Sequence, residues 1–99
     1  MATPRLAPEA LRSALAELPE WSLEADWLRR TYRFHDFVEA FAFMTAAALR
    51  VQEMDHHPEW SNVYGTVRVE LTTHDAGGVT SRDVDLARKL EAIAARWPK

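Results

Sequence analysis

The hydrophobic positions of the chain recur with two different periods, and each change of period marks the border of an expected element. Over residues 8–18 the spacing is helical and Pro8 suits a first turn, which predicts a short amphipathic helix. A longer helix is expected over residues 37–54, because Asp36 and Glu39 form an N-terminal cap and no glycine or proline interrupts the segment. Its apolar stripe is expected to consist of Phe37, Phe41, Met44, Ala48 and Val51. The aromatic and alanine content indicates that this helix is covered on more than one side.

Four other segments alternate apolar and polar residues with a period of two, which is typical of strands. Residues 21–24 and 30–34 form one expected hairpin. Residues 60–64 and 67–72 form a second, with Gly65 at the turn. The last of these strands is expected to have one buried and one wet face. Its apolar positions are Val67, Val69 and Leu71, and its polar positions are Arg68, Glu70 and Thr72.

A third helix is expected near the C-terminus. Gly77 and Gly78 interrupt the strand pattern, and Thr80 is suited to open a helix. The buried stripe of that helix is expected to be Leu86, Leu90, Ile93 and Trp97. The element order is therefore α-β-β-α-β-β-α in a single domain, residues 1–99. The simplest packing is an α+β fold, a four-stranded antiparallel sheet with three helices packed on one face.

Composition and charge exclude several classes of function. The chain has no cysteine, so disulfides, thiolate metal sites and cysteine nucleophiles are absent. The net charge is −3 and the charges are interspersed, apart from Arg29, Arg30 and Arg33, which we expect mostly on a solvated strand face. A primary nucleic-acid function is therefore not expected. No run approaches the roughly 20 apolar residues of a membrane span, and the N-terminus lacks the pattern of a secretory signal. We expect a soluble, cytoplasmic protein.

Three of the four histidines lie at the ends of expected elements, where functional sites are commonly built. His56 and His57 end the long helix, and His74 follows the last strand. Imidazole titrates at about pH 6.5, so these side chains can exchange protons near neutral pH. A structural interpretation stands beside this one, because the helix dipole favours histidine at a helix C-terminus. His35 has no partner in the pattern and is expected to be structural.

Other residues allow more than one interpretation. The three histidines could hold a metal such as zinc, but the His-x-Glu, His-Glu-x-x-His and Cys-x-x-Cys spacings are missing, so no metal site is expected. Asp83 stands three residues after Thr80, which by itself predicts a helix cap. Trp60 and Tyr64 are core or interface aromatics by default, and either could stack on a flat heterocycle.

Four segments, spread in order over nearly the whole chain, carry a specific combination of residues. They are residues 41–45, residues 55–64 with His-His-Pro-Glu-Trp, residues 72–75 with Thr-Thr-His-Asp, and residues 81–87 with Ser-Arg-Asp. Together they resemble the pterin-4a-carbinolamine dehydratase family. The resemblance implies three helices over a four-stranded antiparallel sheet, in agreement with the elements above. It also implies the dehydration of 4a-hydroxytetrahydropterin to quinonoid dihydropterin, with no metal or redox cofactor.

The resemblance further implies which side chains act on the pterin. His56, His57 and His74 match the family's active-site histidines, and Asp83 matches the acidic residue beside them. His56 and His74 are expected to transfer protons, and His57 to bind the pterin. Asp83 is expected to orient or electrostatically support an imidazole. The substrate pocket is expected to be lined further by Trp60, Asn62 and Tyr64.

One position departs from the family pattern. Gln52 stands where members often carry a glutamate, four residues before the first histidine, and Glu53 is adjacent. If that carboxylate tunes a histidine, a slower reaction or a shifted pH optimum is expected.

The resemblance also bears on partners. It implies a homodimer or homotetramer and a functional link to an aromatic amino-acid hydroxylase through tetrahydrobiopterin recycling. The alternative is a non-catalytic relative that keeps the fold as an interaction or assembly protein. Such a relative is expected to have lost a site residue, whereas all four are present here.

Overall fold

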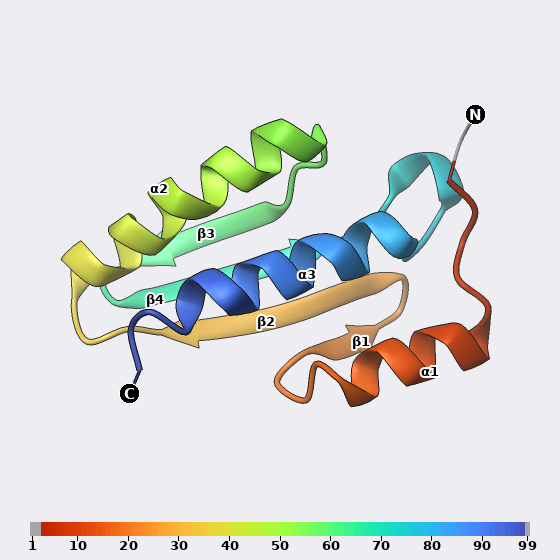
Figure 1. Ribbon diagram of the computed structural model, residues 1–99, viewed down its shortest axis with the longest axis horizontal. Helices are drawn as coiled ribbons and strands as arrows, with labels where there is room; N and C mark the ends of the chain where they lie inside the picture. The colour runs from red at the N-terminus through yellow and green to blue at the C-terminus, as the bar shows by residue number, and fades with distance from the viewer. Residues whose placement is uncertain (1–2, 99) are drawn as a thin grey trace.

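Four antiparallel strands form one open sheet, and α-helices lie across one of its faces (Figure 1). The computed structural model describes residues 3–98. The helices of that part are α1 (Pro8–Ala16), α2 (Phe37–Met54) and α3 (Ser81–Ala94), with a short 3₁₀ turn η1 (His74–Ala76). The strands are β1 (Ser22–Glu24), β2 (Trp27–Arg33), β3 (Glu59–Val63) and β4 (Thr66–Leu71). Their order in the sheet is β1-β2-β4-β3.

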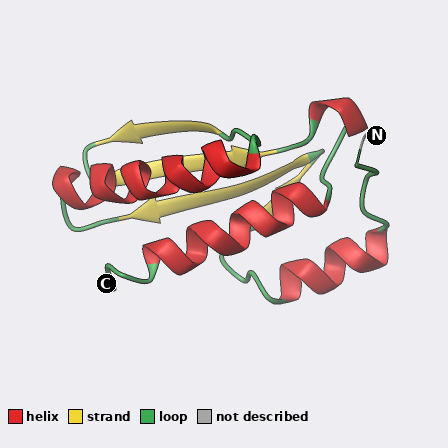
Figure 2. Ribbon diagram, turned by 45° about the horizontal axis from the view of Figure 1, so that its top comes forward, coloured by secondary structure: helices red, strands yellow, loops and turns green. Residues whose placement is uncertain are grey.

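The helices gather on one side, and the opposite face of the sheet carries none of the described helices (Figure 2). Glu17, just after α1, accepts a hydrogen bond of 2.7 Å from Arg88 of α3, so α1 lies beside α3. The expected α+β fold is confirmed in class and in element order. No helix in residues 3–98 is long and apolar enough to cross a bilayer.

The long helix begins and ends where its sequence predicts. A side-chain oxygen of Asp36 accepts a 2.9 Å hydrogen bond from the backbone N–H of Glu39, and Glu39 in turn accepts one from the backbone N–H of His35. These contacts satisfy N–H groups that a helix start leaves without partners. The helix ends at Asp55, whose backbone is left-handed with φ 50°.

The buried stripe of α2 differs from the expected one. Phe37 and Phe41 are 47% and 54% exposed, and Ala48 is also exposed. The buried residues are Ala40, Phe43 and Ala47 together with the predicted Val51, and the predicted Met44 is half-buried against the core. Both stripes have helical spacing, and the one with more alanine lets the helix approach the sheet closely. The predicted stripe, with Phe37 and Phe41, therefore forms a partly apolar surface that faces away from the core.

The inner face of the sheet forms the core with α2 and α3. The predicted apolar face of β4 is confirmed, and so are three of the four predicted positions of α3. The fourth, Trp97, lies beyond the end of α3 and is half-buried against the ring of Phe34 at 6.0 Å between centroids. The ring of Phe43 is fully buried and packs 4.7 Å from that of Tyr32 and 5.0 Å from that of Phe34. The buried hydrophobic residues of β4 and α3 are Val67, Val69, Leu71, Val84, Leu86, Ala87, Leu90 and Ile93.

Strand β2 begins at Trp27, earlier than the sequence predicts, because it pairs with β1 on one side and with β4 on the other. The expectation that Arg30 faces solvent is therefore wrong. Arg30 shares the inner face with Leu28 and Tyr32, and its side chain is only 12% exposed. Arg29 and Arg33 alternate with it and face the uncovered side.

The charge of the buried Arg30 side chain is paired with a carboxylate of α3. One oxygen of Glu91, Oε1, accepts hydrogen bonds from Arg30 Nε at 2.9 Å, Tyr32 OH at 2.8 Å and Trp21 Nε1 at 2.8 Å. Burial raises the pKa of Glu91, but the bonds from Tyr32, Arg30 and Trp21 outweigh burial, and the pKa lies below its ordinary value. Burial, together with the bond to Glu91, raises the pKa of the Tyr32 hydroxyl far above its ordinary value. The cluster ties α3 to β2.

Candidate active site

The backbone conformation at the end of α2 determines where the chain that carries His56 and His57 runs. The left-handed conformation of Asp55, which aspartate tolerates better than most residues, reverses the chain after the last helical turn. The backbone N–H of His56 then donates to the carbonyl of Val51 at 3.3 Å. Arg82, from the first turn of α3, donates to the carbonyls of Met54 at 3.2 Å and Asp55 at 2.8 Å. Two helices that are distant in sequence thus hold the segment that carries His56.

His56 is buried against Asp83. Its Nε2 lies 2.5 Å from Asp83 Oδ1; His56 is 7% exposed and Asp83 is fully buried. The other oxygen of Asp83 accepts from the hydroxyl of Thr73 at 2.8 Å and from the backbone N–H of Thr80 at 2.8 Å. His56 Nε2 and Asp83 Oδ1 thus share a buried hydrogen bond, and which of the two donates depends on the tautomer of the imidazole. Asp83 is therefore both the expected helix cap and a partner of the first histidine.

The same network reaches the segment of the third histidine. The hydroxyl of Thr80 lies 2.8 Å from that of Thr73, and the backbone N–H of Thr73 donates to the carbonyl of Gly78 at 3.0 Å. His74 follows as the first residue of η1, a turn that the sequence does not predict. It closes at Gly77, whose φ of 73° suits glycine. Asp83 thereby connects His56 to the residue before His74.

His74 and His57 are open to solvent. The side chain of His74 is 76% exposed, and its Nε2 lies 3.9 Å from Glu59 Oε2. The ring of Trp27, at the start of β2, meets it edge-on at 5.8 Å between centroids. The side chain of His57 is 58% exposed, with Nδ1 4.0 Å from Asp55 Oδ1. Since Glu59 stands two residues after His57, both imidazoles lie at the end of the sheet where β3 begins.

The structure does not bring every expected pocket residue to this end of the sheet. Trp60 pairs with Val69 on the inner face and is half-buried. Asn62 braces the hairpin, because its side-chain amide donates to the carbonyls of Tyr64 at 3.0 Å and Thr66 at 2.9 Å. Tyr64 is 69% exposed at the hairpin tip. At roughly 3.3 Å per residue, the tip lies on the order of 20 Å along the strand from His57.

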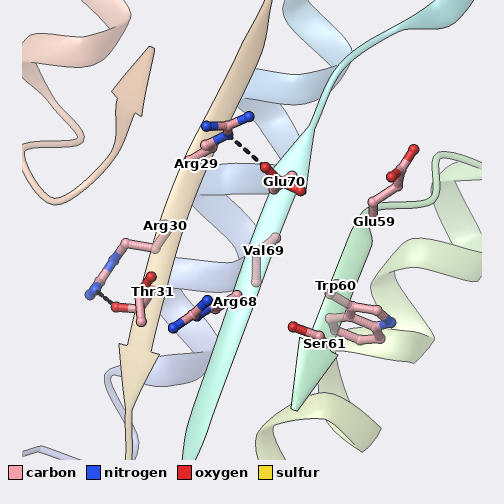
Figure 3. A pocket seen from close by; sticks show the side chains of 9 residues that line it. All are labelled: Arg29, Arg30, Thr31, Glu59, Trp60, Ser61, Arg68, Val69 and Glu70. Carbon is pink, nitrogen blue, oxygen red and sulfur yellow. Dashed lines mark hydrogen bonds and ion pairs between the residues drawn. The ribbon is translucent and has the colours of Figure 1, made fainter. Parts of the chain in front are cut away.

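A hollow of about 500 Å³ opens on the uncovered face of the sheet, and the sequence reasoning missed it (Figure 3). One of its lining residues, Glu59, lies 3.9 Å from His74. The side chains that line it on β2, β3 and β4 are mainly charged or hydroxylated. The alternation of β4 places Arg68 and Glu70 on the wet face, but only the pairing of three strands shows that they share a hollow with Glu59. The lining residues on this face are Arg29, Thr31, Glu59, Ser61, Arg68 and Glu70, and the inner-face residues that alternate with them along the strands, Arg30, Trp60 and Val69, complete the lining.

The residues around the expected tuning position are on the surface. Gln52 is exposed, and Glu53 forms an ion pair of 3.0 Å with Arg50 within α2. His35, which was expected to be structural, is also exposed, with 87% of its side chain accessible. Within residues 3–98, no three His, Cys, Asp or Glu side chains are grouped so that they could hold a metal ion.

Comparison with known proteins identifies the family of the chain. A family model described as pterin 4 alpha carbinolamine dehydratase matches residues 4–93. The chain belongs to this family. A protein of Afipia carboxidovorans, provisionally named pterin-4-alpha-carbinolamine dehydratase, is 58% identical over 95 residues, covering 93% of this chain and 94% of its own length.

Two solved structures also resemble this dehydratase-family chain. A crystal structure from Brucella melitensis, described as a transcriptional coactivator/pterin dehydratase, has 43% sequence identity and a TM-score of 0.88 over 91% of this chain and 98% of its own. A pterin dehydratase-like RuBisCO assembly factor of the α-carboxysome has 20% identity and a TM-score of 0.63, covering 75% of this chain and 86% of its own. The second likeness shows that the fold is shared.

Proposed function

We propose that the protein removes water from 4a-hydroxytetrahydropterin to give quinonoid dihydropterin. The observation that carries the proposal is the grouping, in a chain of this family, of two exposed imidazoles with a third that is held by a buried carboxylate. In the reaction an acid protonates the C4a hydroxyl, which leaves as water. A base takes a proton from a ring N–H as the C=N bond forms. One proton is given and one is taken, so no redox cofactor is involved.

The geometry favours a division of roles that differs from the one suggested by sequence. His74 and His57 expose most of their imidazoles, so a bound pterin can reach them. We assign the two proton transfers to this pair, with Glu59 beside His74. His56, 7% exposed and bonded through Nε2 to Asp83, is assigned to positioning the segment that carries His57. Asp83 keeps the supporting role that the resemblance implies.

The apolar surface of α2 supports assembly into a homodimer or homotetramer. Contiguous exposed apolar residues on a small protein commonly mark an interface. Phe37 and Phe41 lie 5.5 Å apart between ring centroids, and Val38 is 73% exposed. We therefore propose that this stripe packs against a second copy of the chain.

A dehydratase of this kind works beside the enzyme that makes its substrate. We propose that the protein returns the carbinolamine formed by an aromatic amino-acid hydroxylase to the tetrahydrobiopterin recycling route, in the cytoplasm. The chemistry of the substrate supports this position in the reaction sequence, since the carbinolamine is the hydroxylated form of the reduced pterin.

The deciding experiment measures dehydration of 4a-hydroxytetrahydropterin by the wild type, by His74→Ala and by His35→Ala. His74→Ala is expected to lose roughly 10²–10⁴-fold in rate, the usual contribution of a general acid or base. His35→Ala is the matched control, because His35 is as exposed as His74 but has no place in the site. Equal rates for the wild type and His74→Ala would contradict the assignment. No activity in any of the three would favour a non-catalytic interaction or assembly protein.

A further inference from the structure

Two arginines of the open-face hollow differ in their partners. Arg29 lies between two carboxylates, with Nη1 2.7 Å from Glu24 Oε1 and Nε 2.6 Å from Glu70 Oε2. Arg68, on the neighbouring strand, is exposed and makes no ion pair with any carboxylate in residues 3–98. Glu70 is therefore neutralised by Arg29, whereas Arg68 has no carboxylate within ion-pair distance; the other carboxylate that lines the hollow, Glu59, lies two residues away along β3 from Ser61 and beside His74.

The surroundings of Arg68 suit an oxyanion. In the sheet register Arg68 is directly opposite Thr31 on one side and Ser61 on the other, so all three side chains share one face. Figure 3 shows the guanidinium turned toward Thr31 on β2, with Ser61 on the other side of β4. A guanidinium offers a planar fork of N–H donors that matches phosphate or carboxylate, and the hydroxyls add donors.

The hollow continues to the histidines. Glu59 lines it and also lies 3.9 Å from His74. Ser61, opposite Arg68, stands two residues further along β3, which is roughly 7 Å at the rise of a strand. A ligand that meets His74 can therefore extend over the sheet to Arg68.

We propose that the hollow binds an anionic group, phosphate or carboxylate, at the end of the C6 side chain of the pterin. The inference rests on the proposed dehydratase function. In a pterin, C6 is two bonds from the reacting C4a, so the side chain leaves the ring close to His74. A three-carbon chain at about 1.5 Å per bond covers the remaining distance to Arg68. The preferred substrates are then carbinolamines with an acidic side chain.

The test compares three carbinolamines that differ only at C6. One carries a methyl group, one a three-carbon chain ending in a hydroxyl, and one the same chain ending in phosphate. The wild type is expected to show a kcat/KM about tenfold higher for the phosphate than for the hydroxyl, through a lower KM. Arg68→Gln is expected to abolish that advantage and to leave the methyl substrate unchanged. The advantage is also expected to shrink with added salt.

Arg96→Gln is the matched control, because it removes the same charge from an exposed arginine beyond α3. It is expected to alter none of the three rates. Turnover of the methyl substrate reports on the proposed function alone. Full activity on it, with no phosphate preference or with a preference that survives Arg68→Gln, would overturn this inference and leave the dehydratase in place. If the wild type turns over none of the three, the proposed function fails and the inference fails with it.

Discussion

The imidazole Nε2 of His56 lies 2.5 Å from Oδ1 of Asp83, and this contact joins the end of α2 to the first turn of α3. Asp83 is fully buried, so each of its hydrogen bonds is made without competition from water. The pair joins two elements of the fold, and in the proposed active site it also positions the segment that carries His57.

Asp83→Asn tests this double role. The amide keeps the shape but directs an N–H₂ group at one of the donors, so we expect unfolding free energy to fall by about 2–4 kcal/mol and dehydratase activity to fall as well. Urea denaturation and the carbinolamine assay measure the two effects. Asp85→Asn, two residues on but exposed, is expected to change neither. Retention of full stability in Asp83→Asn would show that the buried network is dispensable.

Arg82→Gln tests whether the end of α2 must be held in place. The variant loses donors to the carbonyls of Met54 and Asp55, and we expect a stability loss of about 1–2 kcal/mol. The effect on kcat/KM is expected to be greater, about ten- to a hundredfold, because the neighbouring imidazoles lose their placement. Altered NMR shifts of the His56 and His57 rings at unchanged far-UV circular dichroism would show the displacement. Arg88→Gln, on the exposed side of α3, is the control.

Glu91→Gln tests the cluster that binds Arg30 inside the fold. The pKa of Glu91 is lowered in the folded state, so its charge stabilises the protein above its unfolded value of 4.5, and that contribution is lost as pH falls through the folded value. We expect the variant to be less stable than the wild type by about 2 kcal/mol at pH 7 and nearly equal to it once the pH lies below the folded pKa. Glu17→Gln removes an exposed pair and is expected to cost under about 0.5 kcal/mol. A difference that stays constant with pH would contradict the ionised role of Glu91.

Phe41→Lys tests assembly through α2. The residue is 54% exposed, so the fold of one chain should survive while the apolar stripe is broken. We expect the dissociation constant of the oligomer to rise about tenfold or more in sedimentation experiments. Leu23→Lys places the same charge on an exposed apolar site of β1 and is expected to leave assembly intact. A wild type that remains a monomer at high concentration would refute the interface.

The sequence predicts most of the secondary structure, because its signals are local. The cap at Asp36, the uninterrupted run to residue 54 and the alternation of β4 each depend on neighbours along the chain. The buried stripe of α2 could not be chosen in this way, since two stripes of the helix are apolar. Nor could the position of Arg30, whose burial depends on Glu91 sixty-one residues away.

The sequence indicates which residues form the candidate site, but it does not indicate how deeply each side chain is buried. The histidines and Asp83 stand out by pattern and by family resemblance, but exposure separates them: His56 is buried, while His57 and His74 are open. That separation arises from a contact between residues 27 positions apart. Glu59 and Arg68 share a surface only because three strands pair side by side. The hollow therefore cannot be predicted from any single segment of the sequence.

The alternation of β4 has a consequence for how such a protein can be altered. Val67, Val69 and Leu71 hold the core, while Arg68 and Glu70 between them point away from it. Changes at the outward positions should leave the packing of the inward ones undisturbed. If the hollow binds the substrate side chain as proposed, substrate preference and folding are encoded in alternating residues of one strand. The outward residues could then be exchanged to suit another ligand without changing the inward ones.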